Sequence, residues 1–183
     1  MNTHKKNKGE LDAFANTGLS GLLFVFLSIC FWQGLQGQDP LRFEAEVTLM
    51  KKKIDSLWDQ STPTLVFTGS SSIRMWTDLQ ERFPGKQILN TGFGGSQASD
   101  LLFYLEPLIL EYKPEKVFIY EGDNDLAEGK RPGQVLRTLK EIEEKIHLTL
   151  PGLPIVLISA KPSITRWNPV SYTHLRAHET RAV

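Results

Sequence analysis

Three consecutive serines, residues 70–72, follow Gly69 at the end of a short apolar segment. A serine hydroxyl acts as a nucleophile only when a base removes its proton and donor groups stabilise the resulting oxyanion. Two later turns contain such donors: Gly94-Gly95 offers backbone N–H groups with no Cβ in the way, and Asn124 offers a side-chain amide. Each turn alone also fits a structural role, because such residues commonly cap helices or form tight turns. Together they are the groups that an acyl-transfer site requires.

Each of these turns follows a segment that predicts a buried β-strand. Strands are expected over residues 64–68, 87–90, 117–120 and 154–160, which are rich in apolar and β-branched residues. Because helical patterns separate them, the sequence predicts a parallel sheet with helices on both faces. Ligands of such sheets bind beyond the carboxyl ends of the strands. We therefore expect the serines, Gly95 and Asn124 to converge on one edge of the sheet.

Hydrophobic periodicity predicts three main helices. The first leads into the domain, with residues 51–53, all lysine, on its solvent side. Its apolar positions are Phe43, Val47, Met50, Ile54, Leu57 and Trp58. The second begins at a Ser96 cap and bends at Pro107, and its apolar positions are Leu101, Leu105, Leu108 and Tyr112. The third begins at Pro132, and its apolar stripe is Val135, Leu139, Ile142 and Ile146.

Composition and motif spacing exclude several functional classes. The 183 residues include 21 Lys or Arg and 21 Asp or Glu, so the chain lacks the basic field that a nucleic-acid partner requires. A single cysteine, Cys30, excludes an internal disulfide and a cysteine-rich zinc site. Gln97 stands where a dinucleotide-binding motif has its third glycine, and neither a P-loop nor a Gly-x-Ser-x-Gly elbow is present.

Three blocks in order, between about residues 65 and 167, resemble the SGNH or GDSL hydrolases. The first is VFTGSSSIRMW, where the family usually has Gly-Asp-Ser; the alignment makes Ser71 the nucleophile and puts Ser70 in place of the aspartate. The second, NTGFGGSQASDLL, makes Gly95 the oxyanion glycine. The third, YEGDND, matches Gly-x-Asn-Asp and makes Asn124 the oxyanion asparagine.

This resemblance implies a fold and a reaction. The expected fold is an α/β three-layer sandwich with a parallel, flavodoxin-like sheet, incomplete at its C-terminus. The expected reaction is two-step hydrolysis of carboxylic esters without a metal or another cofactor. The N–H groups of Ser71 and Gly95 and the Asn124 amide would form the oxyanion hole.

The sequence departs from the family in its last block. A late Asp-x-x-His there supplies the general base and the carboxylate that orients it, and this chain has no such motif. Glu144 precedes His147 by three residues, but both fall on the helix before the last expected strand, away from the carboxyl edge. We therefore expect the chain as printed to be close to inactive and the intact relative to be an esterase. The alternative is a non-catalytic carbohydrate-binding or scaffold domain on the same fold.

The sequence says less about the substrate. Arg74, Trp76 and Trp167 could line a polar, aromatic pocket suited to acetylated carbohydrate, although Trp76 also fits a core position and lipid-like esters stay open. The expected partner is thus a small-molecule or carbohydrate ester.

The two ends of the chain do not fit the domain pattern. Residues 1–37 contain lysines, then a long apolar run, then small residues, an order typical of a secretory signal peptide. A membrane anchor or a lipid-modified Cys30 are the alternatives, and all three predict an exported protein that is periplasmic, extracellular or membrane-anchored. Residues 38–62 are expected to form the leading helix, residues 63–169 a partial hydrolase domain, and residues 170–183 a non-native or natural disordered tail.

Overall fold

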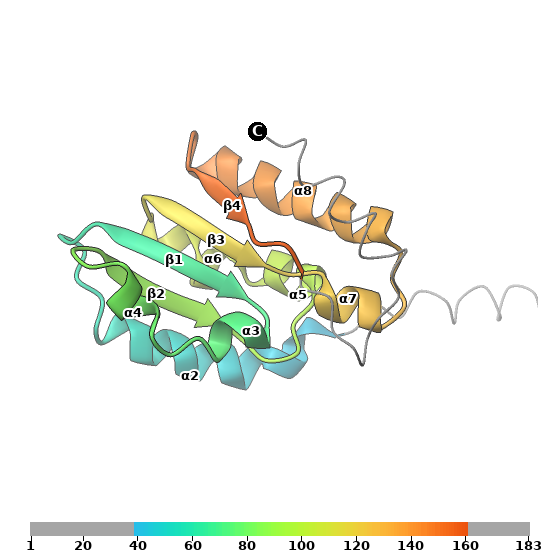
Figure 1. Cartoon of the computed structure of the whole chain (residues 1–183), viewed down its shortest axis with the longest axis horizontal. Helices are drawn as coiled ribbons and strands as arrows, with labels where there is room; N and C mark the ends of the chain where they lie inside the picture. Colours follow the sequence, from blue (N-terminus) through green and yellow to red (C-terminus); the bar gives the residue numbers. More distant parts are fainter. Residues whose placement is uncertain (1–38, 161–183) are drawn as a thin grey trace, which may run out of the picture. The chain divides into compact units, whose positions relative to one another are not determined.

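The computed structural model describes residues 39–160, which contain a four-stranded parallel sheet (Figure 1). The strands are β1 (Thr64–Gly69), β2 (Gln87–Gly92), β3 (Lys116–Tyr120) and β4 (Ile155–Leu157), in the order β2-β1-β3-β4. The predicted α/β class and parallel sheet are confirmed. The expectations for residues 1–37, Trp167 and residues 170–183 concern parts of the chain outside the described residues. In the described range, no helix has the length and apolar character needed to cross a bilayer.

Strand register brings the ends of three strands level. Gly69, the last residue of β1, is paired with Gly92 on one side and with Tyr120 on the other. These residues are also the last of β2 and β3. Because the strands are parallel, the segments that follow them leave the sheet at the same edge.

Helices cover both faces of the sheet. Before β1 lie η2 (Pro40–Phe43) and α2 (Glu44–Asp55); the short helices α3 (Ser71–Arg74) and α4 (Leu79–Arg82) follow β1. Between β2 and β3 lie α5 (Ala98–Phe103), α6 (Leu105–Leu108) and η3 (Leu110–Tyr112). After β3 come α7 (Asp123–Ala127) and α8 (Pro132–Thr149). The predicted start of α8 at Pro132 and its four-residue stripe are confirmed, since all four side chains are buried.

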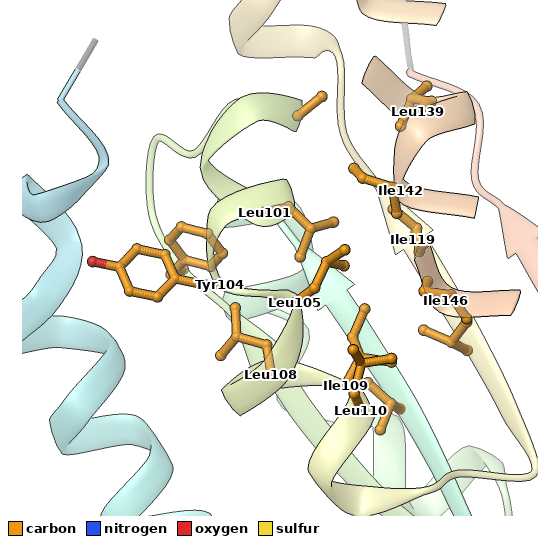
Figure 2. Close-up of a cluster of buried hydrophobic side chains, with 14 of the residues drawn as sticks. Leu101, Tyr104, Leu105, Leu108, Ile109, Leu110, Ile119, Leu139, Ile142 and Ile146 are labelled. Carbon is orange, nitrogen blue, oxygen red and sulfur yellow. The ribbon is translucent and has the colours of Figure 1, made fainter. Parts of the chain in front are cut away.

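Alternate strand residues pack into two separate hydrophobic clusters, as the pleat of a sheet requires. The larger cluster joins one sheet face to α2, α5, α6 and α8. Figure 2 shows part of it, where Leu101 and Leu105 lie near Ile119 of β3 and Ile142 of α8. The smaller cluster lies on the other face and consists of Leu65, Phe67, Ile73, Leu79 and Tyr120, with Trp76 among the partly buried residues packed against it.

The structure corrects three details of the sequence analysis. The helix expected from Ser96 begins instead at Ala98 and is divided into α5, α6 and η3. The Gln97 N–H donates to Asp100 Oδ2 (2.8 Å) at the start of α5, and this leaves the Ser96 hydroxyl to bond elsewhere. Leu57, expected on the buried stripe, is 71% exposed because α2 ends at Asp55. β4 covers only Ile155–Leu157, whereas the sequence predicts a strand over residues 154–160.

Truncation of a side chain in the α8 stripe should destabilise the fold strongly. Ile142 is fully buried, so Ile142→Ala removes packed methylene groups and leaves a cavity. We expect a loss of about 2–5 kcal/mol in the free energy of unfolding, measured by urea titration. Leu148→Ala, on the same helix but 82% exposed, should change it by less than about 0.5 kcal/mol. Equal effects of the two variants would contradict the assignment of the buried face.

Candidate active site

Ser71 stands at a sharp turn between β1 and α3. Gly69 has φ +124°, and a Cβ there would lie 2.7 Å from the carbonyl carbon of Tyr120 and still closer to its oxygen, so only glycine fits. The Ser70 N–H donates to that same carbonyl oxygen (3.0 Å), and the Ser70 carbonyl accepts from Ile73 N–H (3.0 Å). These contacts hold the turn and place the partly buried Ser71 as the first residue of α3.

The segment after β2 brings Gly95 to the same edge. The Phe93 N–H donates to the Gly69 carbonyl (2.9 Å), so the contact with β1 continues one residue past the strand. Gly95 has φ +80°, and a Cβ at this position would face open space. Gly95 is therefore an exposed turn residue, and no neighbouring atom lies close to its Cβ position.

The segment after β3 places Asn124 directly beside the Gly95 turn. Gly122, with φ +107°, precedes α7, and Asn124 is the second residue of that helix. Its Nδ2 donates to the carbonyl oxygen of Ser96 (2.8 Å). The predicted oxyanion asparagine is thus bonded to the residue that follows the predicted oxyanion glycine.

The three residues predicted to carry the chemistry accordingly follow the level ends of β1, β2 and β3. The structure joins Gly95 and Asn124 through Ser96, and it joins the turn before Ser71 to the end of β3 through Tyr120. Their catalytic roles stay a prediction.

Three buried acids beneath these turns were not singled out from the sequence. The Ser96 hydroxyl donates to Glu121 Oε1 (2.6 Å), and the Ala98 N–H donates to Asp125 Oδ2 (3.0 Å). Asp100 is the third acid, with the Gln97 contact described above. In the sequence, Glu121 and Asp125 stand on either side of residues 122–124. A single sequence does not show whether such acids are buried or belong to a solvated turn.

Two of these acids, Asp125 and Asp100, each lie beside a cationic side chain. Lys130 Nζ lies 2.8 Å from Asp125 Oδ1, and Arg42 Nη2 lies 2.6 Å from Asp100 Oδ2. Burial raises the pKa of Asp100, although Arg42 acts against this shift. Burial also raises the pKa of Glu121 well above its usual value, and the nearby Asp125 and Asp100 act in the same direction.

The residues suggested for substrate binding separate into different environments. Arg74 is exposed and lies against Gly94, where a Cβ would be 2.7 Å from its guanidinium carbon. Glu46 Oε1 accepts from both Arg74 Nη1 and Gly94 N–H, each at 3.2 Å. Trp76 packs edge-on against Phe67, with ring centroids 6.1 Å apart, which supports its interpretation as a core residue.

A groove of about 670 Å³ lies beside Arg74. Its wall is formed largely by residues of α2 together with Leu57, two residues beyond the helix, and by residues at the end of β2. The lining residues are Glu46, Leu49, Met50, Lys53, Ile54, Leu57, Arg74, Asn90 and Gly92. The groove is therefore mainly apolar, with charged groups among its lining.

Among the described residues there is neither a cluster of metal-ligating side chains nor a histidine at the carboxyl edge of the sheet. Over residues 39–160, no three His, Cys, Asp or Glu side chains are grouped to hold a metal ion. The single histidine of this range, His147, is in the last turn of α8 and its Nε2 lies 3.0 Å from the Leu153 carbonyl. Since Leu153 precedes β4, His147 lies at the opposite end of that strand from the carboxyl edge.

The parallel four-stranded sheet flanked by helices is an α/β fold that matches the fold of GDSL/SGNH-type lipases and acylhydrolases. No protein-family model matches the chain, and no curated protein sequence matches it.

Solved structures show this likeness. A Streptococcus pneumonia protein assigned as a platelet activating factor superposes with a TM-score of 0.66 at 17% identity, over 85% of this chain and 75% of that one. A Bacteroides fragilis protein assigned as an acylhydrolase gives 0.60 at 18% identity, over 72% and 68% of the two chains. AlinE4, an SGNH-hydrolase family esterase, gives 0.51 at 19% identity, over 65% and 73%. At these identities the likeness concerns the fold.

The Gly69 turn should not tolerate a side chain. Gly69→Ala forces a Cβ into the Tyr120 carbonyl at a positive φ, so we expect a loss of about 3 kcal/mol or more in the free energy of unfolding. Gly129→Ala is the matched control, because Gly129 has φ +84° with open space around its Cβ position and should lose only about 1–2 kcal/mol. Urea titration of both variants measures the difference, and equal losses would show that the close approach to Tyr120 is wrong.

Proposed function

We propose that this chain carries the site of a serine ester hydrolase, with Ser71 as the nucleophile and Gly95 and Asn124 as oxyanion donors. The observation that carries the proposal is the hydrogen bond from Asn124 Nδ2 to the Ser96 carbonyl, at the edge where β1 also ends. This bond links the Asn124 carboxamide to the residue that follows Gly95, and it supports the proposal that both act on one substrate oxygen. Preorganised N–H donors of this kind are what an acyl-transfer transition state requires.

The reaction follows from these groups. A base takes the proton of Ser71 Oγ while this oxygen attacks the carbonyl carbon of an ester, and the carbonyl oxygen becomes an oxyanion held by the three donors. Each donor is worth about 3 kcal/mol of transition-state stabilisation in comparable sites. The alcohol leaves with a proton from the conjugate acid of the base. Water then attacks the acyl-serine in the same way, releasing the carboxylic acid and restoring Ser71.

The general base is the element that this sequence does not supply in the family's pattern. Without it, Ser71 stays protonated, and only the oxyanion hole and substrate binding contribute, about 10³–10⁴ over the uncatalysed rate. We therefore propose that the chain as printed turns over esters slowly. An external base small enough to reach Ser71 should raise that rate.

The substrate proposed is a carboxylic ester that contacts Arg74. The guanidinium lies against Gly94 next to the Gly95 turn, and the apolar groove begins beside it. A polar, acetylated substrate would use Arg74, whereas a lipid-like acyl chain would use the groove. A second candidate function, a non-catalytic carbohydrate-binding or scaffold domain, is favoured by the missing Asp-x-x-His and by Ser70.

Hydrolysis of p-nitrophenyl acetate with and without imidazole tests the proposed reaction. We expect imidazole to raise turnover by the wild-type chain above the sum of the protein-only and imidazole-only rates. Ser71→Ala should abolish this excess, because the excess passes through the Ser71 acyl-enzyme. Ser72→Ala is the matched control: Ser72 is the next residue of the same short helix and is also partly buried, and its loss should leave the excess unchanged.

Two outcomes would count against the ester hydrolase. One is an excess rate that persists in Ser71→Ala, and the other is no excess at all in a folded wild-type chain. The second outcome, together with retention on an immobilised carbohydrate column, would favour the binding domain.

A further inference from the structure

Ser96 joins the segments that follow β2 and β3 by two different bonds. Its hydroxyl donates to Glu121 Oε1 (2.6 Å), and its carbonyl oxygen accepts from Asn124 Nδ2 (2.8 Å). Ser96 is itself buried and directly follows Gly95. The Gly95 turn is therefore held from beneath by Glu121 and from the side by Asn124.

Glu121 is also connected to the turn that precedes Ser71. The Tyr120 carbonyl forms the peptide bond to Glu121, and it accepts the Ser70 N–H (3.0 Å). Thus the Tyr120 carbonyl that precedes Glu121 contacts the serine turn, while the Glu121 side chain contacts the glycine turn.

Hydrogen bonds from Ser96 and from the Gly122 backbone favour the ionised form of the Glu121 carboxyl, but burial and two neighbouring acids outweigh them and raise its pKa. Glu121 is 3% exposed, and among the described residues its Oε2 has no hydrogen-bond partner. The charged groups that face it are Asp125 and Asp100, whose own cations are Lys130 and Arg42. A neutral carboxylic acid avoids repulsion from the two aspartates and still accepts the Ser96 hydroxyl.

We propose that Glu121 is a positioning residue, which through Ser96 fixes the Gly95 N–H beside the Asn124 carboxamide. The effect on catalysis rests on the function proposed above, whereas the effect on the two amides can be measured without turnover. A buried neutral acid serves this purpose because it fills the space beneath the loop and accepts a hydrogen bond without adding charge next to a forming oxyanion.

Three variants separate this role from simple packing. Glu121→Gln keeps the shape and the acceptor of a neutral acid, Glu121→Ala removes both, and Ser96→Ala removes only the hydroxyl while leaving the acid in place. Glu128→Gln, at an exposed glutamate beyond α7, is the control for a change of one charge. If Glu121→Ala fails to fold, Ser96→Ala still tests the same contact.

The first readout is the NMR signals of the Gly95 backbone amide and the Asn124 side-chain amide. We expect both to move in Glu121→Ala and in Ser96→Ala, and to stay close to their wild-type positions in Glu121→Gln and Glu128→Gln. Unchanged signals in Ser96→Ala would overturn the proposal. So would an equal displacement in Glu121→Gln, since a neutral isostere should restore the contact.

The second readout is imidazole-supported, Ser71-dependent turnover. Misplacement of the donors should lower kcat in Glu121→Ala by about 100-fold with KM little changed, and Glu121→Gln should recover most of it. A KM effect alone would overturn the positioning role. If the amide signals respond as expected but no variant, nor the wild type, shows Ser71-dependent turnover, the positioning of the loop holds and the ester hydrolase proposal fails.

The third readout is the pH dependence of stability. Because the pKa of Glu121 is higher in the folded chain than its usual 4.5, its contribution is complete below about pH 4.5 and is lost as pH rises through the folded value. The unfolding free energy of the wild type relative to Glu121→Gln should therefore fall as pH rises above 4.5. A difference independent of pH would show that the acid is ionised in the folded chain and would overturn its neutral role.

Discussion

The close contact between the end of β1 and the end of β3 is the constraint on which the rest of this molecule depends. Gly69 approaches the Tyr120 carbonyl so closely that no side chain fits, and Ser70 then donates its N–H to the same oxygen. This double contact fixes the point at which the chain turns from β1 into α3. Because Gly92 is level with Gly69 on the other side, the segment after β2 leaves the sheet beside it. The site is thus built from backbone register before any side chain contributes.

Near that edge, buried carboxyl groups accept hydrogen bonds from the segment that follows β2, as backbone carbonyls do inside the sheet. The three residues from Ser96 to Ala98 bond to Glu121, Asp100 and Asp125 in turn, through one hydroxyl and two backbone N–H groups. Such bonds satisfy donors that would otherwise be buried without partners at the start of α5. The two acids that have cations, Asp100 and Asp125, bond Gln97 and Ala98, whereas Glu121 bonds Ser96, the residue that follows Gly95.

Sequence reasoning succeeded where the determining interactions are local and periodic. The α8 stripe follows from a spacing of three and four after Pro132, and β1 follows from a short β-rich run that stops at Gly69. Sequence reasoning fails at Ser96. The local pattern predicts that its hydroxyl caps a helix, whereas the actual partner of this hydroxyl, Glu121, is 25 residues away. The same holds for Glu121 itself. A glutamate in a polar turn indicates exposure in one sequence, and only the packing of β3 against β1 shows that it is buried.

The serine at position 70 bears on the choice between an enzyme and a binding domain. In the resembled family this position is usually aspartate, so its replacement could be taken as loss of the catalytic turn. In this chain, however, the turn is held by backbone groups of Ser70: its N–H donates to Tyr120, and its carbonyl accepts from both Ile73 and Arg74 (3.0 and 3.2 Å). None of these bonds requires a carboxylate. The geometry that presents Ser71 is therefore compatible with serine at position 70, which weakens this part of the argument for a non-catalytic domain.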